Sequence, residues 1–176
     1  MQNLIEQMTE EIINGSHILQ GESIAVKLKA SDDGWIAESA VNSVLKSLGY
    51  QVFFQNDTMS QRKFLFDVMT AHYHVQYDEM FRDGLLGVKK VKRTISTELS
   101  AQTFNTRTNE VLFSGSLSKQ AADTVAVDDI QTIELPSVKS THGELPAESF
   151  LDRIVEPFVI IGVTAVAIYL FFHVRS

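Results

Sequence analysis

Residues 23–54 decide the fold, because the stretch SIAVKLKASDDGWIAESAVNSVLKSLGYQVFF reads as strand, helix and strand. In residues 23–29, large apolar side chains alternate with Lys or Ala, which is typical of a half-buried strand. A helical pattern begins near Gly34 and ends before Gly49, and residues 50–54 form a second apolar strand. A crossover between two strands of one sheet is right-handed in nearly all proteins, so the pattern predicts a parallel β-α-β unit.

The central helix carries its apolar residues at the spacing of one helical face. That face consists of Trp35, Ile36, Ala40, Val41, Val44, Leu45 and Leu48. We expect Ser31 or Asp32 to cap the helix, Trp35 to be a packing anchor and Lys46 to face solvent. The sheet residues expected against this helix are Ile24, Val26, Leu28, Ile95, Leu99, Val111 and Phe113.

The segments on either side of this unit predict a larger sheet with more helices. Residues 1–15 show an amphipathic helical pattern that ends at Asn14-Gly15. Three extended segments follow the unit: 63–77, 88–104 and 110–117. Short turns join them, so they predict an antiparallel meander. Residues 127–135 predict a closing helix, which makes the fold an α+β layer of a mixed sheet with helices packed on it.

Composition excludes several classes of protein. The 176 residues include 15 basic and 22 acidic side chains, for a formal charge of −7. Phosphate binding needs a positive surface, so we expect no nucleic-acid partner. The chain has no Cys, which excludes disulfide scaffolds, thiolate zinc sites and cysteine nucleophiles.

The last forty residues differ from the rest. All three prolines lie after residue 135, and the polar stretch 136–149 predicts a linker after a globular domain of residues 1–135. Residues 150–157 show apolar residues at helical spacing, which indicates a juxtamembrane amphipathic segment or a helix that docks back on the domain. Residues 158–174 contain no Asp, Glu, Lys or Arg. At about 1.5 Å per residue such a run reaches roughly 25 Å, so we predict a single C-terminal transmembrane helix.

The residues expected at the lipid bilayer are Pro157, Phe158, Ile160, Ile161, Val163, Val166, Ile168, Tyr169, Leu170, Phe171, Phe172 and Arg175. We expect Pro157 in the first turn of the helix, where a missing N–H costs nothing. The N-terminus has no basic region followed by an apolar core, so it is not a secretory signal as written. The domain is then expected in the cytosol, or in the periplasm if a signal peptide has been removed.

One hairpin carries a resemblance to known proteins. Residues 108–115, TNEVLFSG, resemble the turn-Gly-Glu-Val-Leu-Trp-x-Gly hairpin of the TolB N-terminal domain and the CsgG-like curli-export group, with Asn109 and Phe113 at the Gly and Trp positions. The helix that ends in Leu48-Gly49 and the following meander have the same order there. The resemblance covers roughly residues 23–130 and implies a non-catalytic interaction domain of the bacterial envelope. The missing signal peptide and the C-terminal anchor depart from that pattern.

Two side-chain clusters are candidates for function. Lys89, Lys90, Lys92 and Arg93 form the one basic cluster in the sequence. They indicate either contact with anionic lipid or an acidic partner, or an edge strand that lysines protect from aggregation; we favour the edge strand. His72 and His74 point to one face of a strand, as in a partial zinc site, but Asp67 and Asp78 are expected on other faces or beyond the strand by simple alternation.

No phosphate loop, nucleophile elbow or pair of carboxylates is evident, so we predict no enzyme activity and no cofactor or metal. The sequence predicts a membrane-tethered interaction or assembly protein with a protein partner of unknown identity. An accessory single-span subunit of a larger membrane complex is the alternative. A metal-dependent enzyme centred on His72 and His74 is a third hypothesis.

Overall fold

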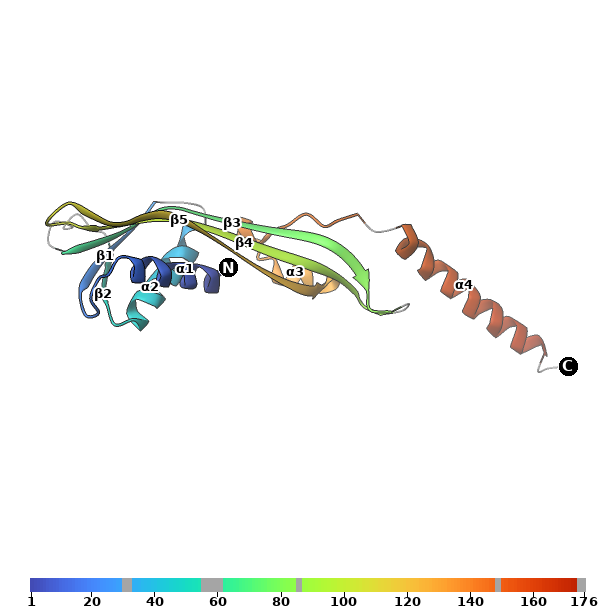
Figure 1. Cartoon of the computed structure of the whole chain (residues 1–176). Coiled ribbons are helices and arrows are strands. Elements are labelled where there is room, and N and C mark those ends of the chain that lie inside the picture. Colours follow the sequence, from blue (N-terminus) through green and yellow to red (C-terminus); the bar gives the residue numbers. More distant parts are fainter. Residues whose placement is uncertain (30–32, 55–61, 85–86, 148–149, 174–176) are drawn as a thin grey trace.

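A computed structural model describes residues 1–29, 33–54, 62–84, 87–147 and 150–173. The chain forms one five-stranded sheet in the order β2-β1-β3-β4-β5, with α1 and α2 packed on the same face (Figure 1). The strands are β1 (Ser23–Leu28), β2 (Gln51–Phe54), β3 (Phe64–Arg82), β4 (Lys89–Asn105) and β5 (Glu110–Ala126). The helices are α1 (Gln2–Gly15), α2 (Gly34–Ser47), α3 (Ile130–Ile133) and α4 (Phe150–His173), with the short 3₁₀ helices η2 (Val127–Asp129) and η3 (Lys139–Thr141). The predicted mixed α+β fold is confirmed.

The β-α-β unit has the predicted pairing. Strands β1 and β2 are parallel, with Ile24 opposite Val52, and β1 is also parallel to the first residues of β3. Asp33 occupies the N-cap position of α2, but its side chain makes no capping hydrogen bond. The predicted caps Ser31 and Asp32 lie outside the described residues. Gly49 adopts a φ of +85°, a backbone conformation that strongly favours glycine and that ends the helix before β2.

The meander is antiparallel as predicted, but two of its strands are longer than the sequence indicates. β3 continues to Arg82, and β5 continues to Ala126 rather than stopping at residue 117. Pairing with β4 holds this extra length, since Thr94 lies opposite Ala122 and Val91 opposite Val125. Cross-strand pairing therefore extends β5 through Ala121 and Ala122, residues with little strand preference of their own.

Two irregularities in β3 change which of its residues face the helices. Before the first one, at Val68/Thr70, the buried residues have even numbers, such as Phe66. After it, Val75 and Tyr77 are buried, and these have odd numbers. One extra residue in a strand reverses the side-chain alternation, so the bulge keeps apolar residues on the covered face along the strand.

The main core lies between the sheet and helices α1 and α2. Leu45, Ile24, Val26 and Leu99 are buried there, as the sequence predicts. Among the described residues, the buried members of this main core are Ile5, Met8, Ile12, Ile13, Ile18, Ile24, Val26, Ile36, Ala37, Ala40, Val41, Leu45, Tyr50, Phe64, Phe66, Val68, Leu99, Ala101 and Val138.

Two predicted core residues are exposed instead. Trp35 is 57% exposed, so the prediction of a packing anchor is wrong. At about 100° per residue, Trp35 falls nearly opposite the middle of the buried stripe of α2. Val111 is 52% exposed, because β5 has one extra residue, Leu112, opposite the step from Thr103 to Phe104 of β4, and this bulge turns Val111 to the uncovered face.

A second, smaller cluster lies where the sheet extends beyond α1 and α2. It consists of Val75, Tyr77, Val91 and Ile130. Ile130 comes from the predicted closing helix 127–135, which forms as η2 followed by the single turn α3. This closing segment therefore covers a part of the sheet beyond the main core, together with Met1 at the start of α1.

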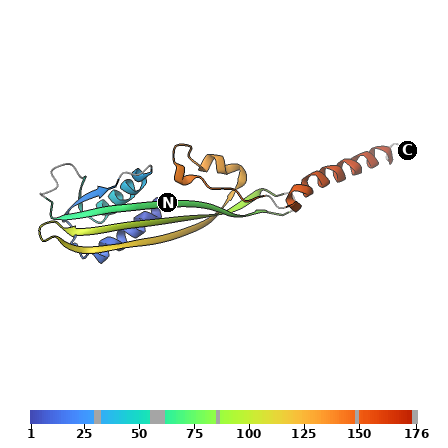
Figure 2. The ribbon, with the colours of Figure 1, turned by 90° about the horizontal axis from the view of Figure 1, so that it is seen from above.

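The first half of the predicted linker packs on the domain. Val138 is 4% exposed and belongs to the main core, and the backbone N–H of Ser140 donates to Asp33 Oδ2 at 3.0 Å. We call residues 135–143 the strap. Figure 2 shows it as a separate loop beside the strands, before the chain continues to α4. The domain boundary at residue 135 stays a prediction.

Helix α4 projects away from the sheet in both views (Figures 1 and 2). It is continuous from Phe150 to His173, so the predicted juxtamembrane segment and the predicted apolar run form one helix of 24 residues. Pro157 therefore lies inside the helix and not in its first turn, which corrects the sequence-based expectation. Across the described part of the chain, no helix is both long and apolar enough to cross a membrane.

Candidate functional site

The end of the sheet beyond α1 and α2 gathers most of the residues that the sequence singled out. We call it the far end; it contains the tips of β3 and β4, the end of β5, the strap and the start of α4. In Figures 1 and 2 the β3–β4 hairpin and the beginning of α4 lie at the same end of the sheet. A surface that α4 contacts therefore lies toward this end of the sheet.

The apolar residues of α4 are exposed. Phe158 is 68% exposed and Phe172 is 70% exposed, and the residues between them are similar. The other members of this exposed set are Ile160, Ile161, Val163, Val166, Ile168, Tyr169, Leu170 and Phe171. Arg175 lies outside the described residues. Large contiguous apolar surfaces of this kind mark sites of contact with a partner or a membrane.

The basic cluster lies on β4, which has β3 on one side and β5 on the other. The interpretation of an edge strand protected by lysines is therefore wrong. Lys90 pairs with Asp83 at 2.9 Å, and Arg93 donates from Nε to Asp123 Oδ1, also at 2.9 Å. The hydrogen bond from Arg93 holds the pKa of Asp123 below its usual value. Lys92 is exposed, and it forms no ion pair with the residues that the structure describes.

Strand geometry separates these four basic residues. Arg93 lies opposite Tyr77 and Asp123, so it belongs to the covered face with the second cluster. Lys90 and Lys92 have the opposite parity and point to the uncovered face. Of the proposed lipid or partner contacts, Arg93 thus serves to tie β4 to β5, whereas Lys90 and Lys92 face outward.

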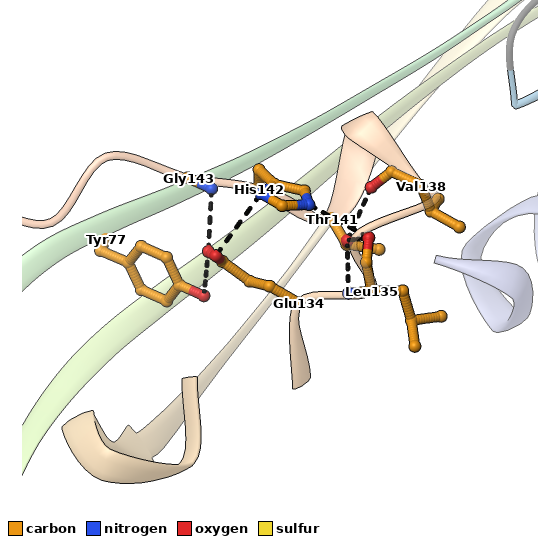
Figure 3. Close-up of polar contacts among 7 residues, drawn as sticks. All are labelled: Tyr77, Glu134, Leu135, Val138, Thr141, His142 and Gly143. Carbon is orange, nitrogen blue, oxygen red and sulfur yellow. Dashed lines mark hydrogen bonds and ion pairs between the residues drawn. The ribbon is translucent and has the colours of Figure 1, made fainter. Parts of the chain in front are cut away.

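A polar cluster around Glu134 attaches the strap to β3 (Figure 3). Glu134 Oε1 accepts hydrogen bonds from the Tyr77 hydroxyl at 3.0 Å and from the Gly143 backbone N–H at 3.1 Å. Its other oxygen lies 3.7 Å from His142 Nδ1, and Thr141 donates to the Val138 carbonyl. These contacts fix both ends of the strap against the sheet.

Burial and the carboxylate of Glu134 together raise the pKa of Tyr77 to about 12. No sequence motif marks this cluster, because its members come from separate segments; Tyr77 and Glu134 are 57 residues apart. The cluster around Glu134 has a structural role, because it holds the strap against β3 ahead of α4.

His72 and His74 are exposed on the same face of β3, as the sequence predicts. Asp78 also lies within β3 and accepts a hydrogen bond from Thr94, which corrects the expectation that it falls beyond the strand. Among the described residues, no three His, Cys, Asp or Glu side chains are placed to hold a metal ion.

Two cavities lie near these histidines. One of about 220 Å³ is lined by residues that include Ala37, Val68 and His72, and it is smaller than most ligand pockets. An open cleft of about 610 Å³ lies between β3 and the strap, beside His74, Tyr77 and His142. Among the residues that line these cavities, no hydrogen bond in the described structure joins a nucleophilic side chain to a base that could activate it.

Comparisons with known proteins find similar solved structures but no matching family. No family model matches the chain, and no curated protein matches it. The solved structures to which it is similar include the C-terminal domain of LpoB from Salmonella enterica (TM-score 0.37, 9% identity, 66% of this chain and 96% of that one). Lipoprotein B from Nitrosomonas europaea gives a TM-score of 0.39 at 11% identity, with 61% and 63% of the two chains covered. Lipoprotein GNA1162 from Neisseria meningitidis gives 0.33 at 14%, with 82% and 99% covered.

Two of these three proteins are named as bacterial lipoproteins. None of the three carries the name of a TolB N-terminal or CsgG-like domain, so the finer resemblance predicted from the sequence is not shown. TM-scores in this range carry no argument about function.

Proposed function

We propose that this chain is a membrane-attached, non-catalytic interaction protein of a bacterial envelope, held at the lipid bilayer by α4. The observation that carries the proposal is the exposed apolar surface of α4, from Phe158 to Phe172. In water this surface is unfavourable, at about 25 cal/mol for each Å² of apolar area. Burial in lipid removes that cost without any contact from the domain.

In its finer form the proposal is that residues 158–174 cross the bilayer once. Eleven of these residues are Phe, Val, Ile or Leu. At about −0.3 to −0.6 kcal/mol each, they favour insertion by roughly 3 to 7 kcal/mol. The proposal rests on α4 and not on the similarity to lipoproteins.

A protein partner of unknown identity belongs to the same proposal. The domain presents a sheet with one face uncovered by helices, and β5 is a long edge strand on that sheet (Figure 1). Unpaired backbone groups on an edge strand can accept a strand from another chain.

Membrane fractionation of cells that express the full chain tests the attachment. We expect the full chain to stay with membranes after extraction with high salt and carbonate, and a chain truncated after Ala147 to be released. The substitution Val166→Arg should also release the chain, since Arg at the centre of a span costs about 2.5 to 3.5 kcal/mol.

Val111→Arg is the matched control, because Val111 is 52% exposed on β5 and Val166 is 59% exposed on α4. The control protein should stay in the membrane fraction. A truncated chain that still resists carbonate extraction would contradict attachment through α4.

A further inference from the structure

The β3–β4 hairpin at the far end differs from its surroundings in both apolar exposure and charge. We call residues 80–84 and 87–92 the far hairpin. Phe81 is 39% exposed and Val88 is 55% exposed, so two large apolar side chains lie on the surface at its tip. The helices of the main core do not reach this part of the sheet (Figure 1).

The same tip is basic on an acidic protein. Residues 80–92 contain Arg82, Lys89, Lys90 and Lys92 against the single acid Asp83, so four positive charges and one negative charge give +3. The whole chain carries −7. The positive charge is confined to the far hairpin itself, since Asp78 and Glu79 precede it on β3 and Asp128 and Asp129 lie on η2, which contacts β4. The hairpin attracts a negative surface from which the rest of the domain is repelled.

Strand alternation places the apolar and basic side chains together. Phe81 lies opposite Lys90 in the pairing of β3 with β4, and Lys92 follows Lys90 by two residues on the same face. The ion pair between Lys90 and Asp83 is exposed on both sides, with side chains 37% and 71% accessible. Exposed pairs of this kind are weak, so Lys90 is available to another anion.

The turn at the opposite end of β4 contains no large apolar residue and a single basic one, Arg107. The β4–β5 turn consists of Thr106, Arg107, Thr108 and Asn109, which are polar, and Asn109 has a φ of 56°. At about 3.4 Å per residue, the 17 residues of β4 separate the two ends by roughly 55 Å. The turn therefore provides an internal reference for the far hairpin.

We propose that the far hairpin is a second membrane contact, in which Phe81 and Val88 enter the boundary of an anionic bilayer and Lys90 and Lys92 bind lipid phosphate. The inference rests on the proposed attachment through α4, since both views place the start of α4 at the same end of the sheet as the hairpin (Figures 1 and 2). An apolar tip with basic residues just behind it has the composition of segments that lie in the interface of anionic membranes.

Two membrane contacts restrict the orientation of the domain more than one contact does. A single helix holds the domain near the bilayer but leaves its orientation free, whereas a second contact at the hairpin orients the long axis of the sheet. The uncovered face and the edge strand β5 are then presented in a defined direction.

The absence of Cys from the chain allows a direct test by labelling single cysteines. The full chain is reconstituted in nanodiscs of phosphatidylcholine alone or with phosphatidylglycerol. The rate of reaction with a membrane-impermeant maleimide is then measured for V88C, T108C and V166C. Circular dichroism confirms that each variant folds; Val88 and Thr108 are exposed, so the substitutions disturb no core.

We expect V88C to react at least tenfold more slowly in the anionic discs than in the neutral ones. T108C should react equally fast in both, and V166C should be protected in both. Each Lys near an anionic surface contributes about a fivefold preference. Adding K90E and K92E to V88C should therefore restore fast reaction, whereas R107E, the same charge reversal at the opposite end of β4, should not.

Equal rates for V88C in the two kinds of disc, with V166C protected, would overturn the hairpin contact and leave the attachment through α4 intact. Fast reaction of both V88C and V166C would overturn the two proposals together. Protection of V88C that persists in K90E/K92E would overturn the role of lipid phosphate.

Discussion

The two halves of the sheet are built on the same strands but are stabilised differently. In the near half, β1 and β2 widen the sheet, and α1 and α2 cover it over a core that includes Leu45 and Phe66. In the far half only β3, β4 and β5 continue, and the second cluster has four buried members. Polar contacts are added there, namely Arg93 with Asp123 and Tyr77 with Glu134. The comparison indicates that folding stability resides in the near half, and that the far half can serve contact.

The largest effect should come from the near core. Leu45 is fully buried, so Leu45→Ala is expected to lower the free energy of unfolding by about 2 to 5 kcal/mol. Lys46→Ala, at the neighbouring exposed position, should change it by only about 0.5 kcal/mol. Urea unfolding followed by circular dichroism measures both, since exposed Trp35 is a poor reporter of the core. Equal effects from the two substitutions would contradict the assigned face of α2.

A smaller and local effect is expected in the far half. Ile130 is 5% exposed in the second cluster, and Ile130→Ala should cost about 1 to 2 kcal/mol because the single turn α3 can detach without unfolding the domain. Amide hydrogen exchange should accelerate near Val75 and Val91 but not near Ile24. Uniform acceleration over the whole sheet would mean that the two halves unfold as one unit.

The contact of Tyr77 with Glu134 should contribute less. Tyr77→Phe removes one hydrogen bond, so we expect a loss of about 1 kcal/mol at neutral pH. The folded-state pKa of Tyr77, about 12, is above its ordinary value of 10. The stability from this group is therefore complete below pH 10 and is lost as the pH rises towards 12.

Unfolding measured from pH 9 to pH 12 should show a shallower decline for Tyr77→Phe than for the unsubstituted protein. Some decline remains, because burial also raises the pKa of Tyr73 to about 12. An unchanged slope would mean that Tyr77 does not titrate with folding.

The smallest effect is expected for the ion pair of Arg93 with Asp123, whose carboxylate side chain is 47% exposed. Asp123→Asn should cost less than about 1 kcal/mol at neutral pH. Because the hydrogen bond from Arg93 lowers the pKa of Asp123, its stabilisation is present above pH 3.8 and is lost as the pH falls through the lowered folded-state value. The difference between the two proteins should then disappear in acid; a difference that persists there would contradict a charge effect.

The near half could be predicted from the sequence, because its signals are local. Alternation in 23–29, the helical stripe that ends at Leu48 and the turn at Gly49 together specify the parallel pairing that the structure confirms. The expectation for Trp35 rests on its large apolar side chain; at about 100° per residue it lies nearly opposite the buried stripe, so its place on the predicted face is wrong. Position on a helical face decides burial more strongly than size does.

The far half depends on pairings that no local signal reveals. The extension of β5 to Ala126 follows from its contact with β4, and the central place of β4 follows from that extension. The attachment of the strap through Glu134 and Gly143 joins segments that a reading of prolines assigns to a free linker. Long-range partners of this kind become visible only when the strands have been placed.

The bulge at Val68/Thr70 limits which insertions and deletions β3 can accept. Between Phe64 and Tyr77, β3 changes the parity of its buried side at this point, so these residues form two segments of opposite alternation joined by one extra residue, Met69. Deleting Met69 alone would join the two segments in one alternation and turn either Phe66 or Tyr77 to the uncovered face. An insertion one residue away would restore the alternation. Length changes in β3 are therefore tolerated only as compensating pairs around the bulge, and relatives of this chain should carry them in that form.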